Sequence, residues 1–145
     1  MELPSQIMEH WAFEPEVLKN YATHYQTGEV IPASLVEKLD KSGKYGQGFA
    51  TTEYLAASLL DMDYHVMNEI PSDLEVNAFE SQVLSGRGIL PQIPPRYRST
   101  YFRHVFAGGY TVGYYSYIWA EVLDADAYQA FKETGDIFNP EVATK

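Results

Sequence analysis

The sequence contains no cysteine, carries few basic residues and has no long apolar run. Without cysteine, disulfide bonds and thiolate metal sites are both excluded. Ten Lys and Arg against twenty Asp and Glu give a net charge of −10, which argues against binding to nucleic acid phosphates. Every apolar run is far shorter than the roughly 18 residues that cross a bilayer, so we expect no membrane contact. The N-terminal residues lack the pattern of a signal peptide, and a cytoplasmic location is therefore expected.

Aromatic residues are plentiful, and tyrosine accounts for most of them. The 145 residues include 12 Tyr, 7 Phe and 2 Trp, and 46% of the chain is hydrophobic. This length and composition predict one folded domain spanning residues 1–145. Buried tyrosines need partners for their hydroxyl groups, so many tyrosines together suggest a polar, hydrogen-bonding wall.

Apolar residues recur at helical spacing, and no segment alternates as a strand would. Proline and capping signals mark the helix starts, and the fold class predicted is all-α. The expected helices begin near Pro4, Pro15, Pro32, Tyr45, Ser72 and Ser99. The second should reach Gly28, and the last should contain Gly108-Gly109 and run to Gly135. Residues 86–95, rich in Gly and Pro, are expected to form a packed or gating loop.

The most informative segment runs from His104 to Tyr117. If the part after Gly109 is helical, Tyr110, Tyr114 and Tyr117 share one face of the helix. Tyrosine hydroxyls and an imidazole are donors suited to a carbonyl that becomes an oxyanion during peptide hydrolysis. Aromatic stripes more often lie in a protein core, and from these residues alone that interpretation is the stronger one.

The chain by itself lacks a complete set of catalytic residues. None of its four histidines belongs to a His-Glu-x-x-His motif, so no full zinc peptidase site is present. A Gly-x-Ser-x-Gly nucleophile elbow is also missing. The residues alone therefore indicate a helical domain with one wall that could face a ligand.

Two segments closely resemble the M3 family of zinc metallopeptidases, which includes oligopeptidases and peptidyl-dipeptidases. One is residues 104–127, from His104 through the Gly-Gly-Tyr sequence to Ala127, and the other is Glu2-Leu3-Pro4-Ser5-Gln6 with the residues up to Trp11. The stretches 54–65 and 95–98 match in the same order. The resemblance covers essentially the whole chain, and it implies the multi-helical C-terminal portion of a zincin-like catalytic domain.

The resemblance also assigns roles to individual residues. Glu2 corresponds to the third zinc ligand of the family. His104, Tyr110 and Tyr117 correspond to the residues that polarise the scissile carbonyl and bind the substrate backbone. The candidate substrate-binding residues are Tyr114, Gly108, Gly109 and Arg98. Arg98 could meet a substrate C-terminal carboxylate, although an ion pair with one of the many acidic residues is the more frequent use of such an arginine.

The catalytic Glu and the two zinc-binding His residues of the family are absent from this sequence. We therefore expect a fragment that lacks the N-terminal part of its enzyme, is inactive alone and binds zinc poorly. The parent would hydrolyse short peptides, and the cut would expose apolar surface that favours self-association. A stand-alone peptide-binding module without catalysis is the main alternative, and a purely structural helical domain is a third.

Overall fold

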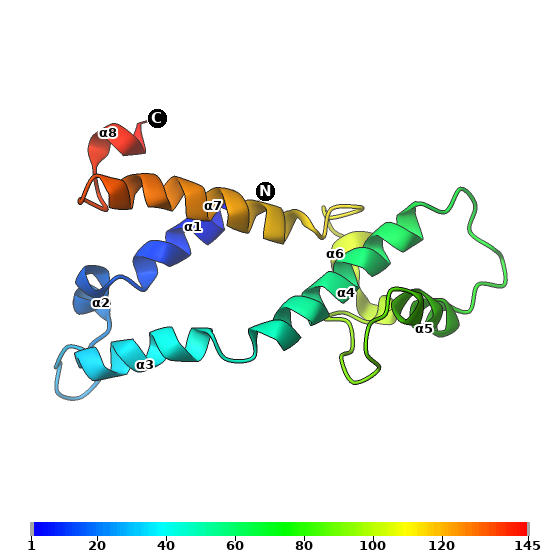
Figure 1. Ribbon diagram of the computed structural model, residues 1–145, viewed down its shortest axis with the longest axis horizontal. Coiled ribbons are helices and arrows are strands. Elements are labelled where there is room, and N and C mark those ends of the chain that lie inside the picture. The colour runs from blue at the N-terminus through cyan, green and yellow to red at the C-terminus, as the bar shows by residue number, and fades with distance from the viewer. Residues whose placement is uncertain (1, 145) are drawn as a thin grey trace. The chain divides into compact units, whose positions relative to one another are not determined.

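A computed structural model describes residues 2–144 and shows the all-α fold that the sequence predicts (Figure 1). In this range no strand forms, and one isolated β-bridge joins Thr23 and Val30. The helices are α1 (Leu3–Ala12), α2 (Pro15–Tyr21), α3 (Ala33–Gly43), α4 (Gln47–His65), α5 (Val76–Gly86), the 3-10 helix η1 (Ser99–Tyr101), α6 (Arg103–Phe106), α7 (Ser116–Glu133) and α8 (Pro140–Ala143).

The helices group into two compact units. The first contains the residues up to Tyr45 together with those from Ser116 onward, and the second contains Gly46–Tyr115. The expectation of a single domain over residues 1–145 stays a prediction.

In the first unit, α1 packs along α7, as Figure 1 shows. The Nε2 atom of His10 lies 2.7 Å from Oδ1 of Asp124, whose side chain is almost fully buried. About one turn earlier on α1, Gln6 Nε2 donates a hydrogen bond of 3.1 Å to the carbonyl oxygen of Tyr117. Because both contacts join the same two helices, they fix the register between α1 and α7.

Aromatic rings fill the space on the other side of this helix pair. The indole of Trp11 meets the rings of Tyr128 and Phe131 edge to face, at centroid distances of 4.8 and 5.0 Å. Its Nε1 donates a 2.7 Å hydrogen bond to the carbonyl of Ile137. The Tyr128 hydroxyl donates to Glu14, and burial together with this bond raises the pKa of Tyr128.

Helix α2 is shorter than the sequence predicts. It ends at Tyr21, whereas the expected helix reached Gly28. Residues 24–29 form a tight turn instead, closed by the amide of His24 donating to Glu29 and the amide of Gly28 donating to His24, each at 2.8 Å. Gly28 has a φ of +72°, a conformation that glycine adopts without steric cost.

The second unit is built on α4, which packs against α5. Ala56, Ala57 and Leu60 of α4 are completely buried, and so are Phe102 and Val105 to within one per cent. Residues 54–60 thus turn one side of α4 to the core, whereas Leu55 remains exposed. Fully burying a side chain such as Leu60 contributes about 1.5–3 kcal/mol.

Near the end of α4, Tyr64 packs against Phe79 of α5 and Phe106 of α6, at centroid distances of 4.7 and 5.2 Å. Burial raises the pKa of Tyr64. The start of α5 differs from the prediction of a capping box at Ser72. The helix begins at Val76, because a turn in which the amide of Leu74 donates to Pro71 occupies the preceding residues.

The predicted helix from Ser99 to Gly135 is wrong in its middle part. Residues 107–115 form no helix and separate α6 from α7, so Tyr110, Tyr114 and Tyr117 do not form a stripe on one helix face. The amides of Val112 and Tyr114 donate to the carboxylate of Asp61 instead of to helical carbonyls. Val112 also has a φ of +57°, which an α-helix cannot contain.

Many large apolar side chains remain exposed, among them Trp119 and Val122 of α7 and Leu35 of α3. The expected self-association of the chain stays a prediction that these exposed residues favour. Among residues 2–144, no helix combines the length and the apolar character needed to span a bilayer.

The His10–Asp124 contact leads to a test of stability. Asp124→Asn should lower the free energy of unfolding by about 1–3 kcal/mol, because it weakens a buried, charge-assisted hydrogen bond between α1 and α7. Urea denaturation followed by circular dichroism measures the change. The control is Asp40→Asn, which removes an exposed ion pair to Lys44 and should cost about 0.5 kcal/mol or less. Equal losses in the two variants would contradict the proposed importance of the buried contact.

Candidate functional site

His104 lies on the short helix α6, with its ring among tyrosine rings. The centroid of its imidazole is 4.6 Å from that of Tyr97, 5.6 Å from that of Tyr114 and 6.0 Å from that of Tyr110. Its Nδ1 atom is buried and has no hydrogen-bond partner among the described residues. A buried polar atom without a partner is costly, so this nitrogen is suited to a hydrogen bond with a water or a ligand.

The 107–115 loop folds back onto α6. The amide of Tyr110 donates a 3.2 Å hydrogen bond to the carbonyl of His104, and Thr111 Oγ1 donates to the carbonyl of Val105 at 2.9 Å. Gly108 approaches the helix so closely that a β-carbon there would lie 2.7 Å from the carbonyl oxygen of His104. The loop therefore brings Tyr110 beside His104, as the sequence-based hypothesis requires.

Asp61 of α4 holds the far end of this loop, and the sequence analysis missed it. Its carboxylate accepts the amides of Val112 and Tyr114, and it is completely buried. The signal that could have revealed it is an acidic residue within the apolar run of Leu59 and Leu60. A carboxylate at such a position needs buried partners.

Tyr114 is only 3% exposed, and its ring packs against that of Tyr54 at a centroid distance of 5.4 Å. Its carbonyl accepts a 2.7 Å hydrogen bond from the Tyr54 hydroxyl. Tyr110, by comparison, is partly exposed. The two tyrosines therefore differ: the ring of Tyr114 belongs to the core of the second unit, whereas Tyr110 retains access to solvent.

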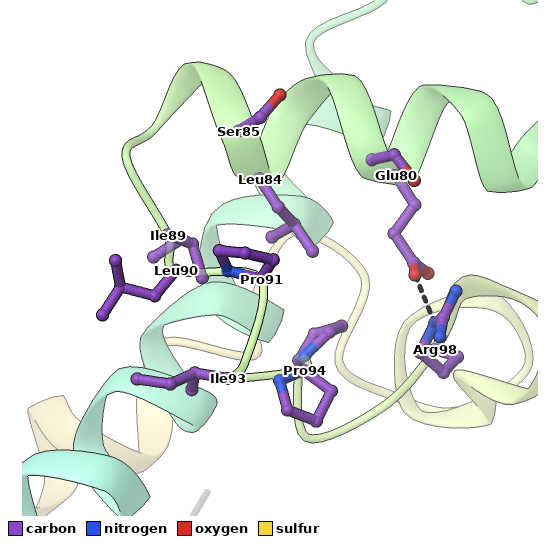
Figure 2. Close-up of a pocket in the computed structure, with 11 residues that line it drawn as sticks. Glu80, Leu84, Ser85, Ile89, Leu90, Pro91, Ile93, Pro94 and Arg98 are labelled. Atoms are coloured by element: carbon purple, nitrogen blue, oxygen red, sulfur yellow. Dashed lines mark ion pairs between the residues drawn. The ribbon is translucent and has the colours of Figure 1, made fainter.

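Arg98 pairs with a buried acidic residue. Its guanidinium forms an ion pair with Glu80 of α5, which Figure 2 shows as a dashed line. The other carboxylate oxygen of Glu80 accepts the amide and the hydroxyl of Ser99 at 2.7 and 2.8 Å. This arrangement favours the structural interpretation of Arg98 over a role in binding a substrate carboxylate.

Beside this pair, α5 and the 89–98 segment enclose a cavity of about 330 Å³ (Figure 2). Its walls are mainly apolar and include Leu84, Ile89, Leu90, Pro91, Ile93 and Pro94. Most residues of the Gly- and Pro-rich stretch 86–95 are exposed, and its expected character as a packed or gating loop stays a prediction.

The other predicted site residues, Glu2 and Tyr117, lie in the first unit. Gln6 connects them, since its amide donates to the carbonyl of Glu2 at 2.9 Å and its side chain donates to the carbonyl of Tyr117. Ser5 Oγ donates a 3.0 Å hydrogen bond to the Glu2 carboxylate. The structure thus links the first turn of α1, which follows Glu2, to Tyr117 in one unit, and it brings His104 close to Tyr110 and Gly108 in the other.

The metal-binding capacity of this chain is limited. Across residues 2–144, no group of three His, Asp or Glu side chains is arranged to hold a metal ion. The role of Glu2 as a metal ligand stays a prediction.

Comparison with known proteins gives consistent matches over almost the whole chain. The family described as Peptidase family M3 matches residues 1–145. A dipeptidyl carboxypeptidase of Salmonella typhimurium is 46% identical over 138 residues, which cover 94% of this chain and 20% of that protein. Oligopeptidase A of Escherichia coli is 38% identical over 142 residues, covering 97% of this chain and 21% of that protein. A probable cytosolic oligopeptidase A of Arabidopsis thaliana is 38% identical over 136 residues, covering 93% of this chain and 19% of that protein. The chain thus spans about a fifth of the length of these relatives.

The close approach at Gly108 gives a test of the loop geometry. Gly108→Ala should lower the free energy of unfolding by about 1–3 kcal/mol, because the added methyl group overlaps the carbonyl oxygen of His104. Denaturant titration of the variant and the wild type measures this loss. Gly48→Ala in α4 is the matched control, since its new methyl group meets no atom within 4 Å and should stabilise the helix by up to about 1 kcal/mol. Wild-type stability of Gly108→Ala would show that the loop does not lie against α6 as described.

Proposed function

The chain belongs to peptidase family M3, and on this basis we propose that it is part of a zinc-dependent peptidase that hydrolyses short peptides. The observation that carries the proposal is the placement of His104 beside Tyr110, with a buried imidazole nitrogen that has no partner among the described residues. We place the whole enzyme in the cytoplasm and leave both oligopeptidase and peptidyl-dipeptidase action open.

In this proposal, His104 and Tyr110 donate hydrogen bonds to the carbonyl oxygen of the scissile peptide bond. Negative charge develops on that oxygen as the carbonyl carbon becomes tetrahedral, so donors aimed at it stabilise the transition state more than the bound substrate. Tyr117 of α7 is the second tyrosine donor. Gly108 and Gly109 leave the backbone open to the substrate main chain, and Tyr114 supports the ring of His104 from the core side.

Glu2 would supply one carboxylate ligand to the zinc ion, and the remaining ligands would come from the N-terminal part of the enzyme. The hydrogen bond from Ser5 orients the Glu2 carboxylate, as neighbouring groups commonly orient metal ligands. When bound, zinc would supply a water acidic enough to attack a carbonyl near neutral pH. Because the described residues hold no metal site of their own, the isolated chain should bind zinc poorly and be inactive.

Arg98 has the weakest support among the proposed substrate-binding residues. Its charge is already balanced by Glu80, and freeing it for a peptide carboxylate would leave that buried carboxylate with Ser99 as its main partner. We therefore assign Arg98 to the structure of the 89–98 segment.

The assignment of Tyr110 is tested by Tyr110→Phe in the full-length enzyme. Losing one oxyanion donor should lower kcat by about 100- to 1000-fold and change KM little. Steady-state kinetics with a fluorogenic peptide measure both constants. Tyr45→Phe is the matched control, because Tyr45 is 92% exposed and should leave turnover unchanged. An unchanged kcat in Tyr110→Phe would remove Tyr110 from the site.

The second candidate function is a stand-alone peptide-binding module that uses the same aromatic wall without catalysis. The tyrosine rings packed around the His104 imidazole favour it, because such a wall can hold a peptide without a metal ion. Denaturing electrophoresis of source cells, with an antibody raised against this chain, separates the two functions. A band several times larger than 16.4 kDa is expected for the peptidase, whereas a band at that mass would favour the binding module.

A further inference from the structure

The carboxylate of Asp61 accepts two backbone hydrogen bonds from the 107–115 loop. Its Oδ1 accepts the amide of Val112 at 3.1 Å, and its Oδ2 accepts the amide of Tyr114 at 3.0 Å. Nδ1 of His65, one turn further along α4, lies 2.9 Å from Oδ1 and forms a 2.8 Å hydrogen bond with the backbone carbonyl oxygen of Asp61. Both oxygens of a completely buried carboxylate are thus engaged by defined donors.

The loop needs this anchor because its backbone is unfavourable on its own. Val112 is β-branched and has a φ of +57°, a conformation that such residues rarely adopt. A strained conformation of this kind persists only where surrounding contacts hold it, and strain of this sort often occurs at functional sites. Asp61 binds the amide of the strained residue itself.

Tyr110 lies between two fixed points of this backbone. On one side its own amide is bound to the carbonyl of His104, and on the other the amide of Val112 is bound to Asp61. Thr111, between them, is tied to Val105. Since no regular secondary structure supports residues 107–115, these bonds decide where the Tyr110 ring lies relative to His104.

We propose that Asp61, held by His65, is a positioning residue that sets Tyr110 against His104 for the reaction and does not itself contact the substrate. The proposal rests on the peptidase function proposed above. It differs from a purely structural role in one respect: loss of Asp61 should impair the chemical step more than substrate binding or global stability.

The test is Asp61→Asn in the full-length enzyme. An asparagine side chain offers one acceptor oxygen, so one of the two loop amides loses its partner while the volume is preserved. We expect kcat to fall about 100-fold with KM changed little, because a shift of about 1 Å in a catalytic group has an effect of this size. Amide hydrogen exchange at Val112 and Tyr114 should accelerate in the same variant, whether or not metal is bound.

Asp63→Asn is the matched control. Asp63 lies on the same helix two residues later and pairs with Arg87, which is exposed, so its loss should change neither kcat nor exchange in the loop. If Asp61→Asn does not fold, His65→Phe replaces it. This variant keeps Asp61 but removes the imidazole that lies 2.9 Å from its carboxylate, and kcat should fall about tenfold.

The outcomes separate this inference from the proposed function. Wild-type enzyme that hydrolyses peptides, together with unchanged kcat in Asp61→Asn or in its replacement, overturns the positioning role and leaves the peptidase function standing. Equal decreases in kcat in Asp61→Asn and Asp63→Asn would also overturn it, because the effect would then not depend on the contact between Asp61 and the loop. Wild-type enzyme that hydrolyses no peptide overturns the proposed function and the inference with it.

Discussion

Asp61 is a buried carboxylate whose two oxygens are bound by the backbone amides of Val112 and Tyr114 and by the imidazole of His65. Removing a charge from water is costly unless partners replace the lost hydration. The loop supplies these partners, and in return the carboxylate holds a backbone that no helix supports. The positions of Tyr110 and of the loop against His104 depend on these hydrogen bonds between the loop amides and the Asp61 carboxylate.

Buried acidic residues perform the same task elsewhere in the chain. In the first unit, Asp124 of α7 binds His10 of α1. In the second unit, Glu80 of α5 binds Arg98 and Ser99 at the end of the 89–98 segment. In each case the acidic residue and its partner belong to different segments of the chain. Because a mispaired buried charge is strongly unfavourable, each pair restricts which residues can meet, and together they set the arrangement within each unit.

The tyrosines differ in burial in the same way. Tyr114 and Tyr128 have buried rings, and each is tied by a defined hydrogen bond in the core of its unit. Tyr110 is partly exposed beside an imidazole nitrogen that lacks a partner within the described range. A high tyrosine content is therefore not a single functional wall: some rings build the core, and others, such as that of Tyr110, remain partly exposed.

The all-α fold and the starts of α1, α2 and α3 could be predicted from the sequence, because proline signals and helical spacing are local properties. The family could be recognised for a similar reason, since its motifs are short continuous segments. The interrupted helix at residues 107–115 could not be predicted, because the competing acceptor, Asp61, lies about 50 residues away in sequence. For the candidate site, sequence identified His104 and Tyr110, but the assignment of Tyr114 to the core and of Arg98 to Glu80 required contacts between distant segments. The sequence by itself thus determined which residue types could donate to a ligand, whereas the tertiary structure decided which of their side chains are buried in the core and which are partly exposed, because burial and long-range hydrogen bonds depend on how the helices pack.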